Sequence, residues 1–385
     1  MKKSICFLLV STLCLSLVLG FSFVGCKTTT STASETTAAP TETTAAPTET
    51  TAAPTETTAA VQYKIGYITR LAVPWWIVCE AGFKAAASKY GFTPVMYHPP
   101  QLTVEDQVRV LESWTAAKLD GVLIGPNDPA AVIGAINQAI DAGIPVLTGY
   151  GVDSPDSNRL LFVGYDPYGL GVAYAKGILA LLKISGVTKG KITYHTGGMA
   201  STEDVASWDG FRKTIGDAGF TAVEPILDDG DAAKAVSLAS QVIGIYPDLV
   251  GMIGYYDYTG PALGKAVTDA GKIDQIVVEG GLIGEVVPFM KTGAIDAVLD
   301  YDQYEANLLA GEILYKLAKA GRENWESVLK EYKAGYPEDK EIIIPFGWVT
   351  SKKVDIEKWP EIAWIKTLEE HQKDYPETWK IIQGK

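Results

Sequence analysis

The side chains best placed to contact another molecule stand where an apolar run of the sequence ends. Val122–Ile124 is a short apolar run, typical of a strand buried on both faces of a parallel sheet. A Gly-Pro pair ends the run, Asn127 and Asp128 follow, and Asp128 can cap a helix that has Pro129 in its first turn. Because ligands of open α/β folds bind at the carboxyl edge of the sheet, we expect this polar loop to lie beside a ligand.

The side-chain arrangements that catalysis would need are missing from the sequence. It contains no Gly-x-Ser-x-Gly motif and no phosphate-binding loop, and Gly197-Gly198 lacks the spacing of a dinucleotide fingerprint. His98, His195 and His371 show no metal-ligand spacing. Paired carboxylates could cleave glycosides, but binding proteins line their pockets with the same residues. We therefore expect a binding protein rather than an enzyme, with no cofactor and no metal.

Residues 1–25 have the pattern of a secretory signal. Two lysines precede the apolar run Ile5–Val24, and a glycine stands before Cys26. The segment Phe23-Val-Gly-Cys26 resembles a lipobox, in which Cys26 is lipidated and becomes the mature N-terminus. The apolar run is almost long enough to span a membrane, so an uncleaved anchor is the alternative. We expect an exported protein, lipid-anchored to the outer face of the cell membrane or periplasmic.

Residues 26–61 follow as a segment with almost nothing to bury. They are Thr, Ala, Ser, Pro and Glu for the most part, with a repeated Glu-Thr-Thr-Ala-Ala-Pro-Thr unit. Such a composition is typical of a disordered tether. About 34 residues of flexible chain have a root-mean-square reach of about 30–35 Å, which would hold the folded part near a membrane.

Charge and cysteine content exclude further classes of protein. The formal net charge is −13, which argues against nucleic acid as a partner. Of the four cysteines, two leave with the signal and Cys26 is the expected lipid site. Only Cys79 remains, so we expect no disulfide framework and no thiolate metal cluster.

The remaining stretch of about 320 residues is long enough for two lobes. Apolar runs alternate with segments of about 12–18 residues that have helical periodicity, such as Trp75–Lys89, Ala130–Ala142 and Asp302–Lys319. The alternation predicts an α/β fold with two doubly wound parallel-sheet lobes, because a second series of strand–helix units restarts near Lys191. The predicted strands are Tyr63–Thr69, Thr93–Tyr97, Gly121–Gly125, Pro145–Gly149, Leu161–Tyr165, Lys191–His195, Ala222–Leu227, Val250–Gly254, Gln275–Glu279, Ala297–Tyr301 and Ile342–Phe346.

Several motifs in order along the chain resemble those of a known family. They are Ile65-Gly-Tyr-Ile with Pro74-Trp-Trp, Lys118-Leu-Asp-Gly-Val-Leu-Ile-Gly-Pro-Asn-Asp-Pro, Ala142-Gly-Ile-Pro-Val-Leu-Thr, Val163-Gly-Tyr-Asp with Gly169, Trp208-Asp-Gly-Phe-Arg and Pro261-Ala-Leu-Gly. Together they resemble type I periplasmic binding proteins, nearest to the ribose-type sugar receptors of ABC importers and, within these, to the branch that binds rhamnose and furanose signals. The resemblance extends from about Tyr63 to Val354.

This resemblance implies two lobes joined by three crossings, with a small polar ligand between the lobes. The N-terminal lobe would comprise residues 62–165 and 302–340, and the C-terminal lobe residues 166–301 and 341–354. The extension 355–385 exceeds the common pattern. Its tryptophans, Trp359, Trp364 and Trp379, are expected to dock it on a lobe.

In the first lobe, the resemblance assigns ligand contacts to residues that follow strands. Trp75 and Trp76 stand where ribose-type receptors carry a pair of phenylalanines that clamps the sugar ring. Arg70 could donate a fork of hydrogen bonds to hydroxyls, or it could form a surface salt bridge. Where the ribose pattern has an Asp-Arg pair, this chain has Tyr150-Gly151, which leaves Tyr150 or Asp153 as the contact.

In the second lobe, the same comparison assigns ligand contacts to a more acidic set of residues. Asp204 stands four residues before Trp208, as in the rhamnose branch. Asp257 matches an Asp of the ribose pattern, whereas Tyr256 replaces its Asn. Tyr301-Asp302 resembles the Trp-Asp of the rhamnose branch.

These residues predict an acidic and aromatic pocket for a neutral sugar or sugar-like solute. Little positive charge disfavours sugar phosphates and acids, and Glu279-Gly-Gly-Leu lacks the ligand-binding Asp of the family's Phe-Asp-Gly motif. The expected function is that of the extracytoplasmic substrate-binding component of an ABC importer, a monomer that closes around its ligand and is read by a membrane permease. The alternatives are a receptor for a sensor kinase or chemoreceptor, or a protein that binds a nucleoside or another aromatic-stacking solute.

Overall fold

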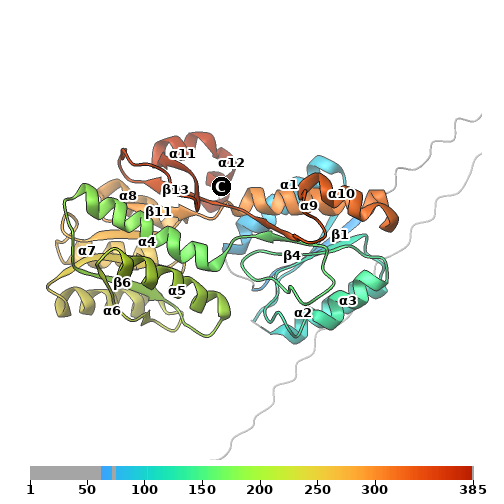
Figure 1. Cartoon of the computed structure of the whole chain (residues 1–385), viewed down its shortest axis with the longest axis horizontal. Helices are drawn as coiled ribbons and strands as arrows, with labels where there is room; N and C mark the ends of the chain where they lie inside the picture. The colour runs from blue at the N-terminus through green and yellow to red at the C-terminus, as the bar shows by residue number, and fades with distance from the viewer. Residues whose placement is uncertain (1–61, 72–74, 102, 384–385) are drawn as a thin grey trace, which may run out of the picture. The chain divides into compact units, whose positions relative to one another are not determined.

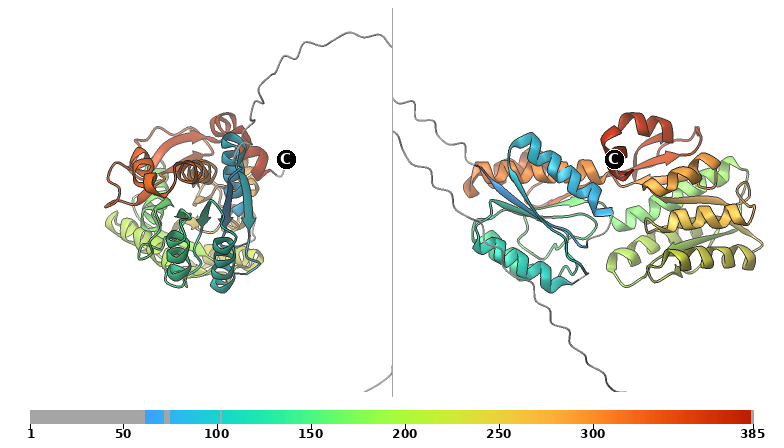
Figure 2. Two further views of the ribbon diagram at one scale, coloured as in Figure 1. Left: turned by 90° about the vertical axis from the view of Figure 1, so that its right-hand side faces the viewer. Right: turned by 180° about the vertical axis from the view of Figure 1, so that it is seen from behind.

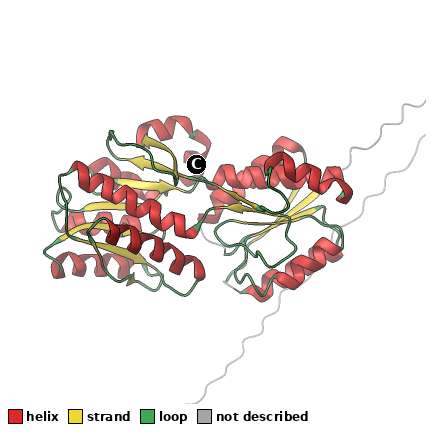
Figure 3. Ribbon diagram, in the orientation of Figure 1, coloured by secondary structure: helices red, strands yellow, loops and turns green. Residues whose placement is uncertain are grey.

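The computed structural model describes residues 62–71, 75–101 and 103–383. The expected signal, the lipid site at Cys26 and the tether through residue 61 lie outside the described residues. Within these ranges, no helix is both long enough and apolar enough to cross a membrane. Strands and helices alternate along most of this length, as Figure 1 and Figure 3 show.

The first sheet has the strand order β12-β5-β4-β3-β1-β2, with all neighbours parallel. Helices α1 and α9, with α10 on α9, cover one face, and α2 and α3 cover the other (Figure 1). The elements are β1 Lys64–Ile68, α1 Trp75–Tyr90, β2 Thr93–Tyr97, α2 Val104–Ala116, β3 Gly121–Ile124, α3 Ile133–Asp141, β4 Val146–Gly149, β5 Leu161–Gly164, α9 Gln303–Ala320, α10 Trp325–Tyr332 and β12 Glu341–Ile343.

The second sheet has the order β14-β13-β11-β10-β9-β6-β7, with β8 also paired to β6. Helices α4 and α5 pack together on one face and α6 and α7 on the other, which Figure 2 shows from behind. The elements are α4 Pro167–Ile184, β6 Lys191–Thr196, α5 Thr202–Asp217, β7 Thr221–Ala222, β8 Ile226–Leu227, α6 Ala232–Ile245, β9 Leu249–Gly254, α7 Thr259–Asp269, β10 Val277–Gly281, α8 Val287–Thr292, β11 Ala297–Asp300, β13 Phe346–Thr350, β14 Ile362–Thr367, α11 Leu368–Asp374 and α12 Pro376–Ile382. The predicted α/β fold with two doubly wound parallel-sheet lobes is confirmed, although β13 runs antiparallel to β11.

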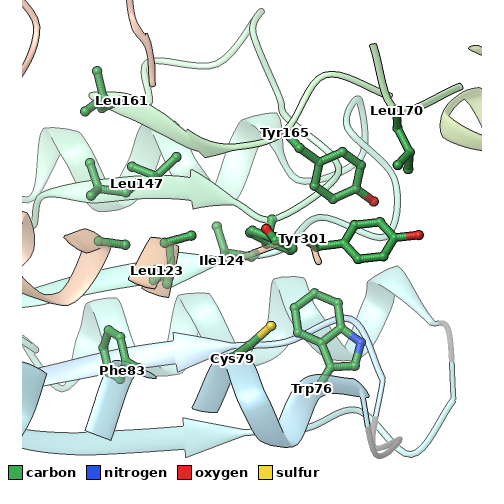
Figure 4. Close-up of a cluster of buried hydrophobic side chains, with 14 of the residues drawn as sticks. Trp76, Cys79, Phe83, Leu123, Ile124, Leu147, Leu161, Tyr165, Leu170 and Tyr301 are labelled. Atoms are coloured by element: carbon green, nitrogen blue, oxygen red, sulfur yellow. The ribbon is translucent and has the colours of Figure 1, made fainter. Parts of the chain in front are cut away.

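The cores form where apolar strands meet apolar helix faces. Val122, Leu123 and Ile124 of β3 are at most 1% exposed, which confirms the prediction of a strand buried on both faces. Figure 4 shows Cys79 and Phe83 pointing from α1 toward these strands, and both are fully buried. Burial raises the pKa of the Cys79 thiol, so this cysteine is a packing residue rather than a reactive one.

The loop after β3 differs from its prediction. Asp128 does not cap a helix at Pro129. Its carboxylate accepts hydrogen bonds from the backbone N–H groups of Ala130 and Ala131 in a turn, and α3 begins only at Ile133. An Asp side chain can accept hydrogen bonds from backbone N–H groups either at a helix start or in a local turn, and here it does so in a turn.

The chain passes between the sheets after β5, after β11 and between β12 and β13. The expected division placed residues 341–354 with the second lobe. However, Glu341–Ile343 pairs with β5 in the first sheet, so this passage occurs between Ile343 and Phe346. The predicted strand Ile342–Phe346 therefore covers parts of two strands, β12 and the start of β13.

The extension beyond residue 354 continues the second sheet. Strand β14 pairs in parallel with β13, and α11 and α12 follow it. Trp379 is 4% exposed and donates a hydrogen bond of 2.8 Å from Nε1 to Nδ1 of the fully buried His371. Since Nδ1 accepts this hydrogen bond, the ring N–H of His371 is at Nε2, which donates a hydrogen bond of 2.9 Å to Asp300 Oδ2. The extension is thereby fixed to the end of β11.

Asp302 follows the second of these passages and has an unusual environment. It adopts the left-handed conformation with φ 55°, which Asp and Asn tolerate better than most residues. Burial, together with the carboxylates of Asp300 and Glu305, raises the pKa of Asp302 to about 7, against a partly opposing effect of Lys366. The side chain therefore holds a proton over much of the range in which an unfolded Asp is ionised.

We predict that Gly210→Ala destabilises the protein and that Gly216→Ala, in the same helix, does not. A Cβ at Gly210 would lie 2.2 Å from the backbone oxygen of Tyr168, where α5 packs on α4. The overlap should cost about 1–3 kcal/mol in the free energy of unfolding. A Cβ at the exposed Gly216 meets nothing within 4 Å, so alanine there should be neutral or stabilising by about 0.5–1 kcal/mol. Urea unfolding of both variants measures the difference, and equal midpoints would contradict this account of helix packing.

A second prediction concerns Asp302→Asn. Between pH 4 and 7 folded Asp302 keeps a proton that the unfolded chain has released, so its contribution to stability falls as the pH rises through that range. Asparagine cannot ionise. The variant should therefore gain in Tm over the natural protein from pH 5 to 7, and the gain should level off above pH 7.

Thermal unfolding at pH 5, 6, 7 and 8 measures this gain. Asp156→Asn, at an exposed position, is the control for the change in net charge. A difference in Tm that stays constant over the whole pH range would show that Asp302 is not the titrating group.

Candidate functional site

A cavity of about 450 Å³ collects residues that follow strand ends in both sheets. Arg70 follows β1, Tyr165 follows β5, and Tyr255–Asp257 follow β9, all at carboxyl ends. This is the position at which open parallel sheets bind ligands. The lining residues are Arg70, Leu71, Trp75, Trp76, Tyr150, Tyr165, Leu170, Gly197, Gly198, Ala200, Ser201, Glu203, Asp204, Asp229, Gly230, Tyr255, Tyr256, Asp257, Gly281, Leu282, Ile283 and Tyr301.

Aromatic rings form one wall of the cavity. Trp75 starts α1, and its ring centroid lies 4.8 Å from that of Trp76, 5.3 Å from Tyr150 and 6.3 Å from Tyr301. The Tyr150 hydroxyl donates to the backbone oxygen of Tyr301. In Figure 4, Trp76, Tyr165 and Tyr301 gather at the same end of the strands. Trp76 and Tyr150 are nearly buried, whereas Trp75 keeps a partly exposed face that a ligand ring could stack on.

An ion pair between the two lobes crosses the cavity. Nη1 of Arg70, beyond β1 of the first sheet, donates to Oε2 of Glu203 in the first turn of α5 at 2.7 Å. The Tyr165 hydroxyl donates to the other oxygen of Glu203. Burial would lower the pKa of Arg70, but the charge and hydrogen bond of Glu203 outweigh it and raise that pKa. Nε of Arg70 is buried and has no hydrogen-bond partner among the described residues.

Other carboxylates give the cavity its acidic character. Asp204 forms a capping box with Ser201 at the start of α5 and accepts a hydrogen bond of 3.2 Å from the Tyr256 hydroxyl. Asp257 accepts one of 2.8 Å from the backbone N–H of Tyr258. Burial raises the pKa of both Asp204 and Asp257, because water is partly excluded from the charged form. Asp229, at φ 59°, also lines the cavity.

Most of the predicted ligand contacts line this cavity, but three do not. Asp153 pairs with Arg159 and accepts from the Thr148 hydroxyl at 2.5 Å, next to a different hollow. Trp208 packs in the core against Tyr194, with ring centroids 5.4 Å apart. Asp302 lies at the passage after β11, outside the cavity lining. The predicted residues that do line the cavity are Arg70, Trp75, Trp76, Tyr150, Asp204, Tyr256 and Asp257.

The loop at Asn127 and Asp128 is also absent from the lining. It acts indirectly, because Asn127 Nδ2 donates to the backbone oxygen of Arg70 at 3.1 Å. The backbone N–H of Asn127 in turn donates to Oε1 of the buried Gln107 at 2.8 Å. This loop therefore supports the main chain that carries Arg70.

Sequence analysis did not propose Glu203, Asp229, Tyr165 or Tyr255 as cavity residues, whereas it named Tyr301, together with Asp302, through the family resemblance. For Glu203 a signal was present. Ser201-Thr-Glu-Asp204 has the spacing of a capping box, which uses Asp204 at the helix start and leaves Glu203 free to project. Nothing in the sequence distinguishes Tyr165 and Tyr255 from core aromatics, and both are at most 6% exposed in the structure.

The cavity has no evident metal chemistry. In the parts of the chain that the structure describes, no group of three His, Cys, Asp or Glu residues could hold a metal ion. Burial lowers the pKa of His195 to about 3, so this histidine is neutral in the core of the second sheet.

Comparison with known proteins agrees with this geometry. A curated relative, a D-ribose/D-allose-binding protein of Pseudomonas aeruginosa, is 25% identical over 206 residues. The match covers 50% of this chain and 61% of that protein, so the chain spans less than two thirds of its relative.

Solved structures match over most of the chain. An arabinose-binding protein from Geobacillus stearothermophilus has a TM-score of 0.63 at 24% identity, covering 76% of this chain and 97% of that one. A periplasmic solute-binding protein of an ABC transporter from Actinobacillus succinogenes, with bound D-allose, also reaches 0.63, at 19% identity over 75% of this chain and 98% of that one. These likenesses concern the fold. Residues 68–323, more than half of the sequence, match the family described as periplasmic binding protein domain, and the chain belongs to that family.

Proposed function

We propose that this protein is the extracytoplasmic substrate-binding component of an ABC importer and that it binds a neutral sugar. The observation that carries the proposal is the cavity at the carboxyl ends of both sheets, with a partly exposed Trp75 face beside the Arg70–Glu203 pair. The resemblance to a D-ribose/D-allose-binding protein supports the same class of ligand.

The side chains match the two requirements of a sugar. Its C–H faces pack on aromatic rings, here Trp75 with Tyr150 and Tyr301 behind it. Its hydroxyls need fixed partners, because an unpaired buried polar group costs about 1–3 kcal/mol. Asp204 and Asp257 can accept hydrogen bonds from hydroxyls, and the Arg70 guanidinium can donate to them.

The charge of the cavity limits the ligand to a neutral or cationic one. The lining contains one guanidinium, that of Arg70, and four carboxylates, those of Glu203, Asp204, Asp229 and Asp257. A sugar phosphate or sugar acid would bring further negative charge into this group, which costs free energy in a site of low dielectric. Catalysis is not part of the proposal, since these carboxylates already serve as caps and hydrogen-bond acceptors.

Ligand binding would stabilise the closed arrangement of the lobes. Arg70 lies beyond β1 in the first lobe, and Glu203 and Asp204 begin α5 in the second. A ligand whose hydroxyls contact both groups binds the closed state more tightly and shifts the population toward it. A membrane permease would then recognise the closed lobes. Export and lipidation at Cys26, which would place the protein at the cell surface, belong to the proposal on sequence grounds, as does the monomeric state.

The aromatic wall favours one alternative class of ligand. Trp75 and the surrounding tyrosines could stack a nucleobase as well as a sugar ring. Isothermal titration of the purified protein with D-ribose, D-allose, D-arabinose, D-glucose, D-galactose, rhamnose and the common nucleosides separates the two. We expect saturable binding of an aldose or deoxysugar. Binding of nucleosides with no response to any sugar would overturn the ligand class.

Trp75→Ala should weaken sugar binding about 10- to 100-fold, because it removes the partly exposed stacking face of the cavity. Tyr168→Ala is the matched control, since Tyr168 is 42% exposed and lies outside the cavity lining. Titration calorimetry measures the affinity, and a melt of each variant verifies folding. Unchanged affinity in folded Trp75→Ala would remove Trp75 from the site.

A further inference from the structure

A second, larger hollow of about 1100 Å³ adjoins the cavity described above. The two share the lining residues Leu71, Trp75, Gly230, Tyr256, Asp257, Leu282 and Ile283. We call the cavity the inner chamber and the hollow the outer chamber, and we take the shared residues, such as Trp75 and Ile283, as the threshold between them. A group attached to a ligand that stacks on Trp75 could extend across this threshold into the outer chamber.

The outer chamber has a different chemistry from the inner one. Its additional wall is largely aliphatic and aromatic, although Tyr258, Lys265, Glu285, Gln303 and Gln383 also contribute. Ile77, which is 52% exposed, lines this chamber. The apolar wall consists of Ile77, Val78, Ala232, Val236, Pro261, Ala262, Phe289, Ile381 and Ile382. A concave apolar surface joined to a binding cavity favours an apolar occupant, because filling it removes that surface from water.

The C-terminal extension provides part of this wall. Ile381 and Ile382 belong to α12, which contacts α1 of the first lobe. A Cβ at Gly284 of the second lobe would lie 2.4 Å from the backbone oxygen of Ile382, so the end of α12 packs tightly there. The Trp379–His371–Asp300 hydrogen bonds fix α12 in this position. The matched family region ends at residue 323, so Ile381 and Ile382 lie beyond the matched region, unlike the rest of the wall.

We propose that the outer chamber is a subsite for an apolar or aromatic substituent, and that the ligand is a glycoside or similar sugar conjugate rather than a free monosaccharide. The inference rests on the proposed sugar-binding function and extends it. The sugar occupies the inner chamber between Trp75 and the carboxylates. Its substituent passes Ile283 and packs between Ile77 and Ile382, in the chamber that both side chains line.

The test compares methyl and phenyl glycosides of D-glucose, D-galactose, D-allose and D-ribose, in both anomers, by calorimetric titration of the full chain. We expect at least one phenyl glycoside to bind about 10-fold or more tightly than its methyl counterpart. In Ile77→Ser and in Ile382→Ser this preference should fall below about 3-fold, with the affinity for the methyl glycoside unchanged. Ile184→Ser is the control, because Ile184 is 56% exposed and lines neither chamber.

The outcomes separate this inference from the function on which it rests. Sugars that bind without any preference for the phenyl group overturn the subsite and leave the sugar-binding function intact. No binding of any free sugar or glycoside overturns both. If both serine variants still bind the phenyl glycoside more tightly than the methyl glycoside, the substituent does not bind in the outer chamber. Sedimentation velocity tests a further outcome. If the protein is a dimer and Ile77→Ser dissociates it, the outer chamber is an interface with a second copy of the chain, and the proposal is overturned.

Discussion

The burial of parallel strands on both faces is the constraint on which the rest of this structure depends. A strand such as β3, with Val122–Ile124 at most 1% exposed, cannot carry a functional polar side chain along its length. Polar chemistry is therefore concentrated in the loops after the strands, where Arg70 and Asp257 stand. Glu279 is an exception within β10. It is fully buried, accepts a hydrogen bond of 2.6 Å from Trp348 Nε1, and has a pKa raised well above its usual value by burial, so it is held protonated in the core.

The Arg70–Glu203 pair shows how the two lobes depend on each other electrostatically. Each side chain is less than one fifth exposed, so each needs a partner of opposite charge or a hydroxyl-bearing ligand in its place. Tyr165 and the loop at Asn127 hold the two sides of this pair. A ligand that enters the cavity therefore meets groups that already have defined positions, which lowers the entropic cost of binding.

The C-terminal extension adds a physical link that the two-lobe fold alone does not have. Strand β14 lengthens the second sheet, while α12 reaches α1 beside the first. The link is fixed by buried polar groups rather than by apolar packing alone, since Asp300, His371 and Trp379 satisfy one another. A change at His371 would therefore affect both the end of β11 and the outer wall of the cavity.

The amino-acid sequence was enough to predict the fold class. Hydrophobic periodicity identified most strands, because burial on two faces leaves a continuous apolar run that needs no tertiary information. Resemblance to the family then assigned Trp75, Asp204 and Asp257, which follow those strands. Sequence analysis merged β12 and the start of β13 into one predicted strand, Ile342–Phe346, because the apolar run continues where the chain passes between the sheets. It also extended α3 too far toward its N-terminus, because Asp128 favours a turn and a helix cap equally well.

Which polar and aromatic side chains line the cavity depends on tertiary contacts. The sequence does not separate Asp153 and Trp208 from the predicted residues that line the cavity, but one pairs with Arg159 and the other packs against Tyr194. Glu203 becomes a cavity residue because its neighbour Asp204 is held in the capping box and because Arg70, far away in sequence, lies opposite. These are contacts between residues distant along the chain. Local propensity and periodicity carry no information about them, since they depend on how the two sheets and the extension pack together.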